Sequence, residues 1–459
     1  MNNYPLGKLI NQDTRGQDAD TPVFIDKRDL AWVAFLALVG AFINILPYSR
    51  MVSMAFQVGI AAVVVLGNLK RPVMLIVSFI FLHLMPSRMI AGFNEASSSV
   101  YTVNKLILSL MVLTFLFINT FISKEKYKGK FNPWLFAFAV FMAISYTWSI
   151  SFLYYDTSFI WLVVAYAFYP YFISTEKDIR LILFSLFVSM QIFGLAVLPT
   201  LATGEFYRGQ IRLDPNFSSM ALTFCVISAL ALLLQYKELL GRFLKAGLIA
   251  GIVFDVFILS FFASRTAFFG LAIIFLFFMV LNMNKPGTIV LSAAAVVAGF
   301  FYFEGRGLFD TVFKRFSAMD VNRFGGRTGI WKGLLVSIRQ FNAFRLIFGN
   351  GYLTTGFFGA GSGGQAHNTY LSIFIGFGAI GLIIFLIYQV SSTVSIVKRG
   401  FVPFLLLVLN MLIYNFSLEP YILSEGVLFL VLLGAMGAVT LEREEVPPLN
   451  PFLNKRKNQ

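Results

Sequence analysis

The chain has 459 residues, of which 58% are hydrophobic and only 13% charged, whereas soluble domains contain about 45–50% apolar and about 25% charged residues. A soluble fold could not bury this much apolar surface, so most of the chain is predicted to lie in lipid, and the continuous apolar runs exclude a transmembrane β-barrel. The net charge of +14 is explained by basic cytoplasmic loops rather than by nucleic-acid binding. The single cysteine, Cys225, excludes a disulfide within the chain and a cysteine metal cluster.

The apolar runs predict an all-α fold, a polytopic membrane helix bundle of about 12–14 transmembrane helices, since each span needs about 20 apolar residues. The first 29 residues lack the pattern of a cleaved signal, so the first helix is expected to stay as an anchor. The predicted helices cover 30–47, 51–68, 72–86, 103–122, 133–149, 158–174, 179–198, 217–234, 246–262, 266–282, 288–303, 369–390, 401–416 and 422–439.

The helices divide the chain into six predicted parts. These are a cytoplasmic N-terminal tail (1–29), N-terminal transmembrane helices (30–198), transmembrane helices with Arg-bearing outer loops (199–303), a large outer loop with short amphipathic helices (304–368), C-terminal transmembrane helices (369–440) and a cytoplasmic tail (441–459). The lysines of 123–132 predict that this loop is cytoplasmic, and the loop 304–368 is then outside.

The two sides of this topology differ in their cations. The inner side carries 14 Lys and 8 Arg, and the outer side carries 3 Lys and 11 Arg. A guanidinium can grip a phosphate through two parallel hydrogen bonds, which an ammonium cannot do. The excess of Arg therefore predicts an outer site for a phosphate-bearing ligand. Loose pairing with lipid headgroups and local carboxylates is the alternative.

The outer loop 199–217 supplies the first candidate residues. Arg208 and Arg212 are four residues apart and share a face if the loop is helical. Asp214-Pro215-Asn216 follows, and Asn216 is predicted to cap a helix that starts at Phe217. A plain loop-to-helix boundary would explain the proline and the asparagine but not the two arginines.

Ser264-Arg265-Thr266 forms a predicted tight outer turn between two strongly apolar helices. An arginine at the membrane surface is a functional candidate, and the alternative is a side chain that extends to the headgroups. Asp255 lies ten residues earlier, about 15 Å deeper in a regular helix. It is a candidate partner for a cation or a hydroxyl.

The long loop contains an amphipathic segment that opens at Arg327 and includes Trp331. Its apolar face is predicted to cover the site or to lie on the outer leaflet, and it consists of Ile330, Trp331, Leu334, Leu335, Ile338 and Phe341. Seven glycines follow between 349 and 364. They predict a segment that bends easily, as a lid, a substrate channel or a simple linker.

His367 stands where this loop meets a helix that Asn368 can cap, and His83 is the only other histidine. A helix N-terminus disfavours a protonated imidazole, so His367 is expected to be neutral and able to accept a proton. A structural role is the alternative for His367, and His83 is expected either to pack in the core or to support a residue of the site. The chain has no P-loop and no HExxH motif, so we expect no metal and no cofactor. The energy for a reaction outside the membrane must then arrive in the substrate, for example in a lipid pyrophosphate.

In this order, the motifs resemble those of the bacterial O-antigen ligase and polymerase superfamily. The resemblance covers about 200–440 and rests on Asp214-Pro215-Asn216, Ser264-Arg265-Thr266, Arg327-Thr-Gly-Ile-Trp331, and Gly349 and Gly351 leading to His367-Asn368. The first seven predicted helices match only in hydropathy.

The resemblance implies a metal-independent, inverting glycosyltransferase at the outer face of the bacterial cytoplasmic (inner) membrane. It would move a glycan from undecaprenyl pyrophosphate to an acceptor hydroxyl. By resemblance, Arg212 and Arg265 hold the pyrophosphate with Arg208 and Arg327 in support, and His367 activates the acceptor. Asn216, Trp331 and Asn368 complete the predicted substrate-binding set. Asp255, Glu419 and Glu425 remain alternative bases.

The acceptor distinguishes two versions of this reaction. A polymerase adds to another carrier-linked repeat unit and is favoured by the helix number and the long outer loop, whereas a ligase adds to lipid A core. A lipid-linked oligosaccharide flippase is the rival from another class, and a scaffold without chemistry is a further alternative. The expected partners are the undecaprenyl-pyrophosphate-linked oligosaccharide, the acceptor glycan or lipid A core, membrane lipids, and a chain-length regulator and flippase of the same pathway, with no nucleic acid.

Overall fold

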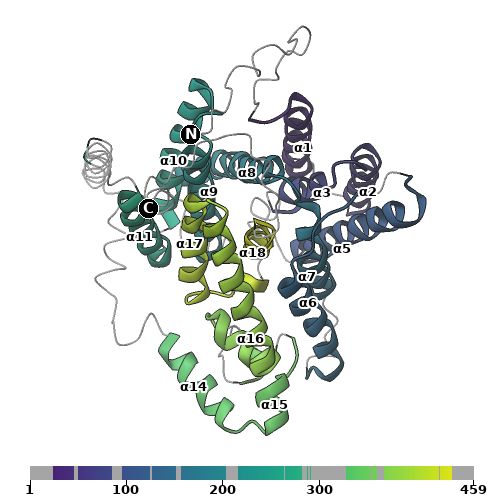
Figure 1. Cartoon of the computed structure of the whole chain (residues 1–459), viewed down its shortest axis with the longest axis vertical. Coiled ribbons are helices and arrows are strands. Elements are labelled where there is room, and N and C mark those ends of the chain that lie inside the picture. Colours follow the sequence, from purple (N-terminus) through teal and green to yellow (C-terminus); the bar gives the residue numbers. More distant parts are fainter. Residues whose placement is uncertain are drawn as a thin grey trace, which may run out of the picture.

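The computed structural model describes residues 24–45, 50–84, 96–124, 127–150, 157–202, 215–262, 264–281, 287, 290, 327–352, 354–358, 366–422 and 424–436. All regular elements in these ranges are helical, as the apolar runs predict (Figure 1). Of the predicted spans, only 288–303 lies almost wholly outside the described residues. The first elements are α1 (Lys27–Ile45), α2 (Arg50–Gly67), α3 (Val73–Phe79) with a π-helical turn η1 (Ile80–Leu84), α5 (Ala96–Phe117) with η2 (Ile118–Ile122), α6 (Pro133–Ser145) with η3 (Tyr146–Trp148), and α7 (Thr157–Phe168) with η4 (Tyr169–Phe172).

The second part of the chain contains the long helices and the predicted motifs. Its elements are α8 (Glu176–Ala202), α9 (Pro215–Gln235), α10 (Arg242–Phe262), α11 (Arg265–Leu281), α14 (Arg327–Arg339), α15 (Ala343–Phe348), η6 (Thr355–Phe358), α16 (Thr369–Lys398), η8 (Val402–Phe404), α17 (Leu405–Asn415), η9 (Pro420–Ile422) and α18 (Ser424–Met436).

Five of the described helices are long and apolar enough to cross a membrane, and seven further apolar helices are shorter. Their outward faces carry exposed apolar side chains, such as Leu195 at 60% and Phe121 at 74% of full exposure. Contiguous apolar surface of this kind marks contact with lipid or with another protein. The helices are therefore compatible with a membrane protein.

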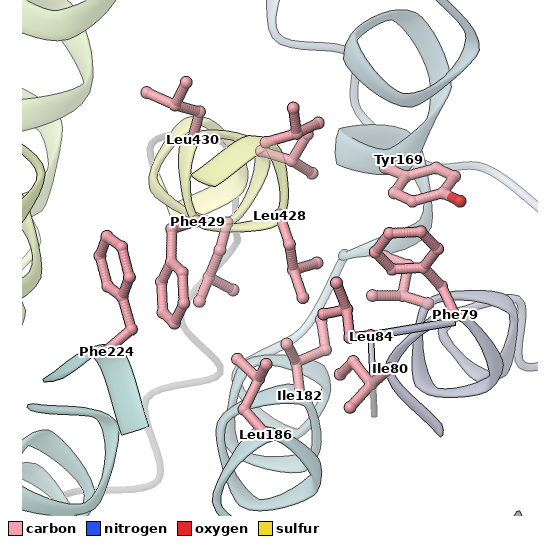
Figure 2. Close-up of a cluster of buried hydrophobic side chains, with 14 of the residues drawn as sticks. Phe79, Ile80, Leu84, Tyr169, Ile182, Leu186, Phe224, Leu428, Phe429 and Leu430 are labelled. Carbon is pink, nitrogen blue, oxygen red and sulfur yellow. The ribbon is translucent and has the colours of Figure 1, made fainter. Parts of the chain in front are cut away.

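The helix α18 lies in the middle of the hydrophobic core (Figure 2). The ring of Phe429 stacks on Phe224 of α9 with centroids 3.9 Å apart. Leu428 lies on the side of α18 that faces Phe79 and Ile182, from α3 and α8 (Figure 2). Because all residues from 426 to 436 are buried, α18 joins helices from the two halves of the chain into one core.

The structure corrects the prediction of a straight helix over 369–390. Gly378 has φ 64° and ψ −165° inside α16, so the helix is broken there. In a straight helix Tyr370 and Gln389 would lie about 28 Å apart along the axis, yet the Tyr370 hydroxyl donates to Gln389 Oε1 at 3.3 Å. The two halves of α16 therefore bend toward each other, and the first half, Thr369–Phe377, lies inside the protein with most of its residues buried.

The break is held by the segment that carries Gly349 and Gly351. The backbone N–H and the side-chain amide of Asn350 both donate to the Ile375 carbonyl at 2.9 Å, and Gly351 N–H donates to Gly376 at 2.7 Å. A Cβ on Gly349 would overlap the Gly376 carbonyl, and Gly349 also needs φ 77°. These two glycines therefore serve close backbone packing rather than the mobility that the glycine-rich composition predicts. The glycines at 359, 361, 363 and 364 lie outside the described residues.

The helices α14 and α15 lie together at one end of the molecule, next to α16 (Figure 1). The predicted apolar face of α14 packs there in a small core of its own, where Leu334 and Phe341 are buried with Ala366 and Ile375. Leu335 was predicted on this face but is 49% exposed. The amphipathic segment thus packs on the start of α16.

Candidate functional site

The predicted His367 motif forms a tight turn at the buried N-terminus of α16. Asn368 Oδ1 accepts the Leu371 N–H at 3.0 Å, which confirms its predicted role as the helix cap. His367 has φ 49° and is the one described residue other than glycine with a positive φ. A residue with a Cβ pays about 1–2 kcal/mol for this left-handed conformation, so the surrounding contacts must hold the turn.

Glu419 supplies one of these contacts. Its side chain is only 3% exposed, and its Oε1 accepts the His367 backbone N–H at 3.1 Å. Burial raises the pKa of the Glu419 carboxyl to about 7, and hydrogen bonds from the Ala366 and His367 backbone and the Ser372 side chain limit the rise. This carboxyl can therefore change its protonation state near neutral pH.

Trp331 holds the other side of the turn. Its indole N–H donates to the Ala366 carbonyl at 2.9 Å, across 35 residues of sequence. The predicted substrate-binding residue Trp331 therefore has a structural contact to the His367 turn. Arg327 begins the same helix and is half-buried, so α14 links Arg327 and His367 into one region.

The connection between α17 and α18, which carries Glu419, is fixed by three hydrogen bonds. The Thr369 hydroxyl donates to the Leu418 carbonyl at 3.3 Å, and the Ser372 and Tyr421 hydroxyls lie 2.7 Å apart. Tyr166 of α7 donates to the Tyr421 carbonyl at 2.6 Å. Irregular backbone between apolar helices needs such partners because its polar groups are shielded from water.

The predicted turn Ser264-Arg265-Thr266 is present between α10 and α11. Ser264 is 1% exposed and Arg265, the first residue of α11, is half-buried. Among the residues that the structure describes, Arg265 has no ion pair and no hydrogen-bond partner for its guanidinium. The helix α11 packs on α17, and α17 leads directly into the connection that contains Glu419.

The other predicted arginines of the phosphate site, Arg208 and Arg212, lie outside the described residues, as does Asp214. The prediction that Asn216 caps a helix starting at Phe217 was wrong: α9 begins at Pro215, so Asn216 lies in its first turn. The reason is that proline is favoured at the first helical position, where its missing N–H has no intrahelical partner anyway. The predicted role of Asn216 in substrate binding stays a prediction.

Asp255 is fully buried in α10, remote from solvent. Its Oδ2 accepts from Gln191 Nε2 at 2.8 Å and from the Cys225 thiol at 3.1 Å. Its described partners are thus an amide and a thiol rather than a cation. His83 is 2% exposed and stacks on Phe79 with centroids 5.1 Å apart, which confirms the expected packing role.

Two features of the site were missed or undervalued in the sequence. Glu419 was only one of three alternative bases, although its position as a rare carboxylate between two apolar helices is visible in the sequence. The role of Asn350 between the two glycines had no sequence signal, because its acceptor is the carbonyl of Ile375, 25 residues later at the helix break.

The described residues contain no group of three or more His, Cys, Asp or Glu side chains that could hold a metal ion. Comparison with known proteins found no matching family model, no matching curated protein and no matching solved structure.

Proposed function

We propose that this chain is a polytopic membrane glycosyltransferase that transfers a glycan from undecaprenyl pyrophosphate to an acceptor hydroxyl at the outer face of a bacterial cytoplasmic membrane. One observation carries the proposal. Three motifs that are separate in sequence, 327–331, 349–351 and 366–368, all contact the first half of α16. They surround a turn that holds a histidine beside a buried carboxylate.

The chemistry assigns one role to each group. The acceptor oxygen forms a bond with the anomeric carbon as the bond from that carbon to the pyrophosphate oxygen breaks, with inversion. The His367 imidazole takes the acceptor proton, and Glu419 holds the His367 turn through its backbone N–H. Arg265 stabilises the negative charge of the departing pyrophosphate, since preorganised cations act on charge that develops in the transition state. Arg208, Arg212 and Arg327 are the proposed additional pyrophosphate ligands.

We favour the polymerase version, in which another carrier-linked repeat unit is the acceptor, with the ligase as the second version. The test is the glycan profile of a deletion strain on a gel. Single-repeat products are expected for a polymerase, and long chains stranded on the carrier lipid would indicate a ligase. Absence of any externalised repeat would indicate a flippase and would contradict glycosyl transfer.

The proposed orientation places 304–368 outside and 123–132 in the cytoplasm. Gln340 and Lys128 are both exposed in the described structure. A membrane-impermeant thiol reagent on intact cells should label Gln340→Cys and not Lys128→Cys, and native Cys225 is buried and should give little background. Labelling of Lys128→Cys alone would place the candidate site on the wrong side of the membrane for an externalised acceptor.

A further inference from the structure

An apolar groove with a volume of about 690 Å³ runs between the second half of α16 and α17. Leu386 of α16, Leu412 of α17 and Leu430 of α18 line it, together with Tyr370 at the start of α16. The volume falls within the range of about 300–1,000 Å³ that is typical of small-molecule sites. The groove is therefore large enough to hold a ligand, and it is larger than a packing defect.

Four of the five polar side chains that line the groove have hydrogen-bond partners within the described part of the chain, and the Ser392 hydroxyl is the exception. Gln389 Oε1 accepts the Tyr370 hydroxyl at 3.3 Å, and the Thr393 hydroxyl donates to the Gln389 carbonyl at 2.8 Å. A peptide segment would bring backbone N–H and C=O groups that need partners in an apolar setting. A hydrocarbon chain brings no such groups, so it is the occupant that this lining fits.

One end of the groove adjoins the candidate site. Tyr370 lies three residues after His367, and Phe416 lies three residues before Glu419. Both side chains line the groove, and their rings pack with centroids 5.1 Å apart. A ligand in the groove would therefore end beside the turn that holds His367.

We infer that this groove binds the prenyl hydrocarbon chain of the lipid-linked donor and so places its phosphates at the candidate site. The inference rests on the proposed function, because it assigns the apolar part of the same substrate. It also explains why the groove lies on helices of membrane-spanning character, α16 above all, since a prenyl chain can enter it sideways from the lipid.

The test uses the full-length protein in nanodiscs of phosphatidylglycerol and phosphatidylethanolamine. A prenyl phosphate with a diazirine in its chain is photoactivated, and the adducts are mapped by mass spectrometry. We expect adducts on α16 and α17 that excess undecaprenyl phosphate removes and excess phosphatidylglycerol does not. Such competition separates a prenyl site from a surface that any acyl chain covers.

Two tryptophan variants on neighbouring positions provide the matched control. Leu386 lines the groove and is 41% exposed, whereas Ile387 is 37% exposed and does not line it. Leu386→Trp should fill the groove and lower adduct yield at least about tenfold. Ile387→Trp should leave the yield within about twofold, because its side chain adds bulk only toward the lipid.

Four results would overturn the inference. They are absence of adducts, adducts that map outside the groove, equal competition by phosphatidylglycerol, and equal adduct yields in the two tryptophan variants. If no adducts form and the wild-type protein is found to be a dimer that Leu386→Trp dissociates, the groove is assigned to a second copy of the chain. Because the probe carries no glycan, specific adducts in a protein without transferase activity would leave the groove standing and refute the proposed function alone. Normal transfer together with adducts outside the groove would refute the groove inference and leave the proposed function standing.

Discussion

Arginines in two regions of the molecule have opposite surroundings. Where α1 meets the connection from α2 to α3, Arg71 Nη1 lies 2.7 Å from Asp29 Oδ2 and 3.5 Å from Asp26 Oδ2. Nearby, the Arg180 guanidinium lies 5.3 Å from the Tyr236 ring. At the turn from α10 to α11, Arg265 has neither kind of partner among the described residues.

This difference separates charges that stabilise the fold from charges that are candidates for ligand binding. A buried carboxylate beside an arginine is compensated within the fold, and such a pair needs no ligand. Arg265 has no such partner among the described residues, and in the proposed function it binds the pyrophosphate. Glu419 is buried with backbone and hydroxyl partners but no described cation. We therefore expect changes in the first region to alter stability, and changes in the second region to alter transfer.

The largest expected effect is the loss of transfer activity in variants of His367. A general base contributes about 10²–10⁴-fold to rate, so His367→Gln should slow transfer by that factor in a reconstituted assay. His367→Asn is the sharper variant, because asparagine tolerates the positive φ of this turn and still lacks a basic nitrogen. Near wild-type turnover in His367→Asn would leave the histidine with a structural role only.

Arg265 comes next, with Arg71 as its counterpart. Arg265→Ala should lower transfer about 10²–10³-fold, as loss of a transition-state donor does, while the apparent melting temperature in detergent stays near that of wild type. Arg265→Lys should rescue poorly, because an ammonium loses the two-point grip on a phosphate.

Arg71→Ala should show the reverse pattern. It leaves the buried Asp29 carboxylate without its partner, at a cost of about 1–3 kcal/mol in stability, and should not change transfer per folded molecule. If both alanine variants reduce stability and transfer in parallel, the distinction between the two regions does not hold.

Two glycines with positive φ distinguish the contact at the helix break from the cost of the backbone conformation itself. Gly378 and Gly400 both have positive φ, 64° and 77°, but a Cβ at Gly378 would overlap the Ile347 carbonyl whereas Gly400 faces open space. Gly378→Ala should therefore destabilise the protein about 1–3 kcal/mol more than Gly400→Ala, measured by thermal unfolding in detergent. Equal losses would mean that the contact between α15 and the break is dispensable.

The last prediction concerns the pH dependence of stability at Glu419, an effect that is spread over several pH units. Its pKa is raised by burial from 4.5 to about 7, so the fold favours the neutral carboxyl. The contribution of this carboxyl to the free energy of unfolding is fully present below pH 4.5 and is lost as the pH rises through about 7. The total change is about 3 kcal/mol. Wild type should thus lose stability relative to Glu419→Gln between about pH 5 and 7. Parallel melting curves across this range would contradict a buried, uncompensated carboxyl.

The sequence by itself determined the features that depend on local pattern. Apolar runs located the long described helices, and the capping preference of Asn368 marked the start of α16. The spacing of Ile330, Leu334 and Ile338 defined the covered face of α14. These predictions succeed because helix periodicity and capping involve residues within one or two turns of each other.

The tertiary structure alone decided how α16 is built and what surrounds His367. The run 371–388 is almost wholly apolar on both sides of Gly378, so nothing local distinguishes a straight span from a helix broken at this glycine. The break exists because carbonyls that leave the helix find donors on Asn350 and Gly351. Glu419 likewise gains its place beside His367 from a contact across 52 residues. Hydrogen bonds between distant segments form only once the chain has packed, and the periodicity of a single segment does not contain them.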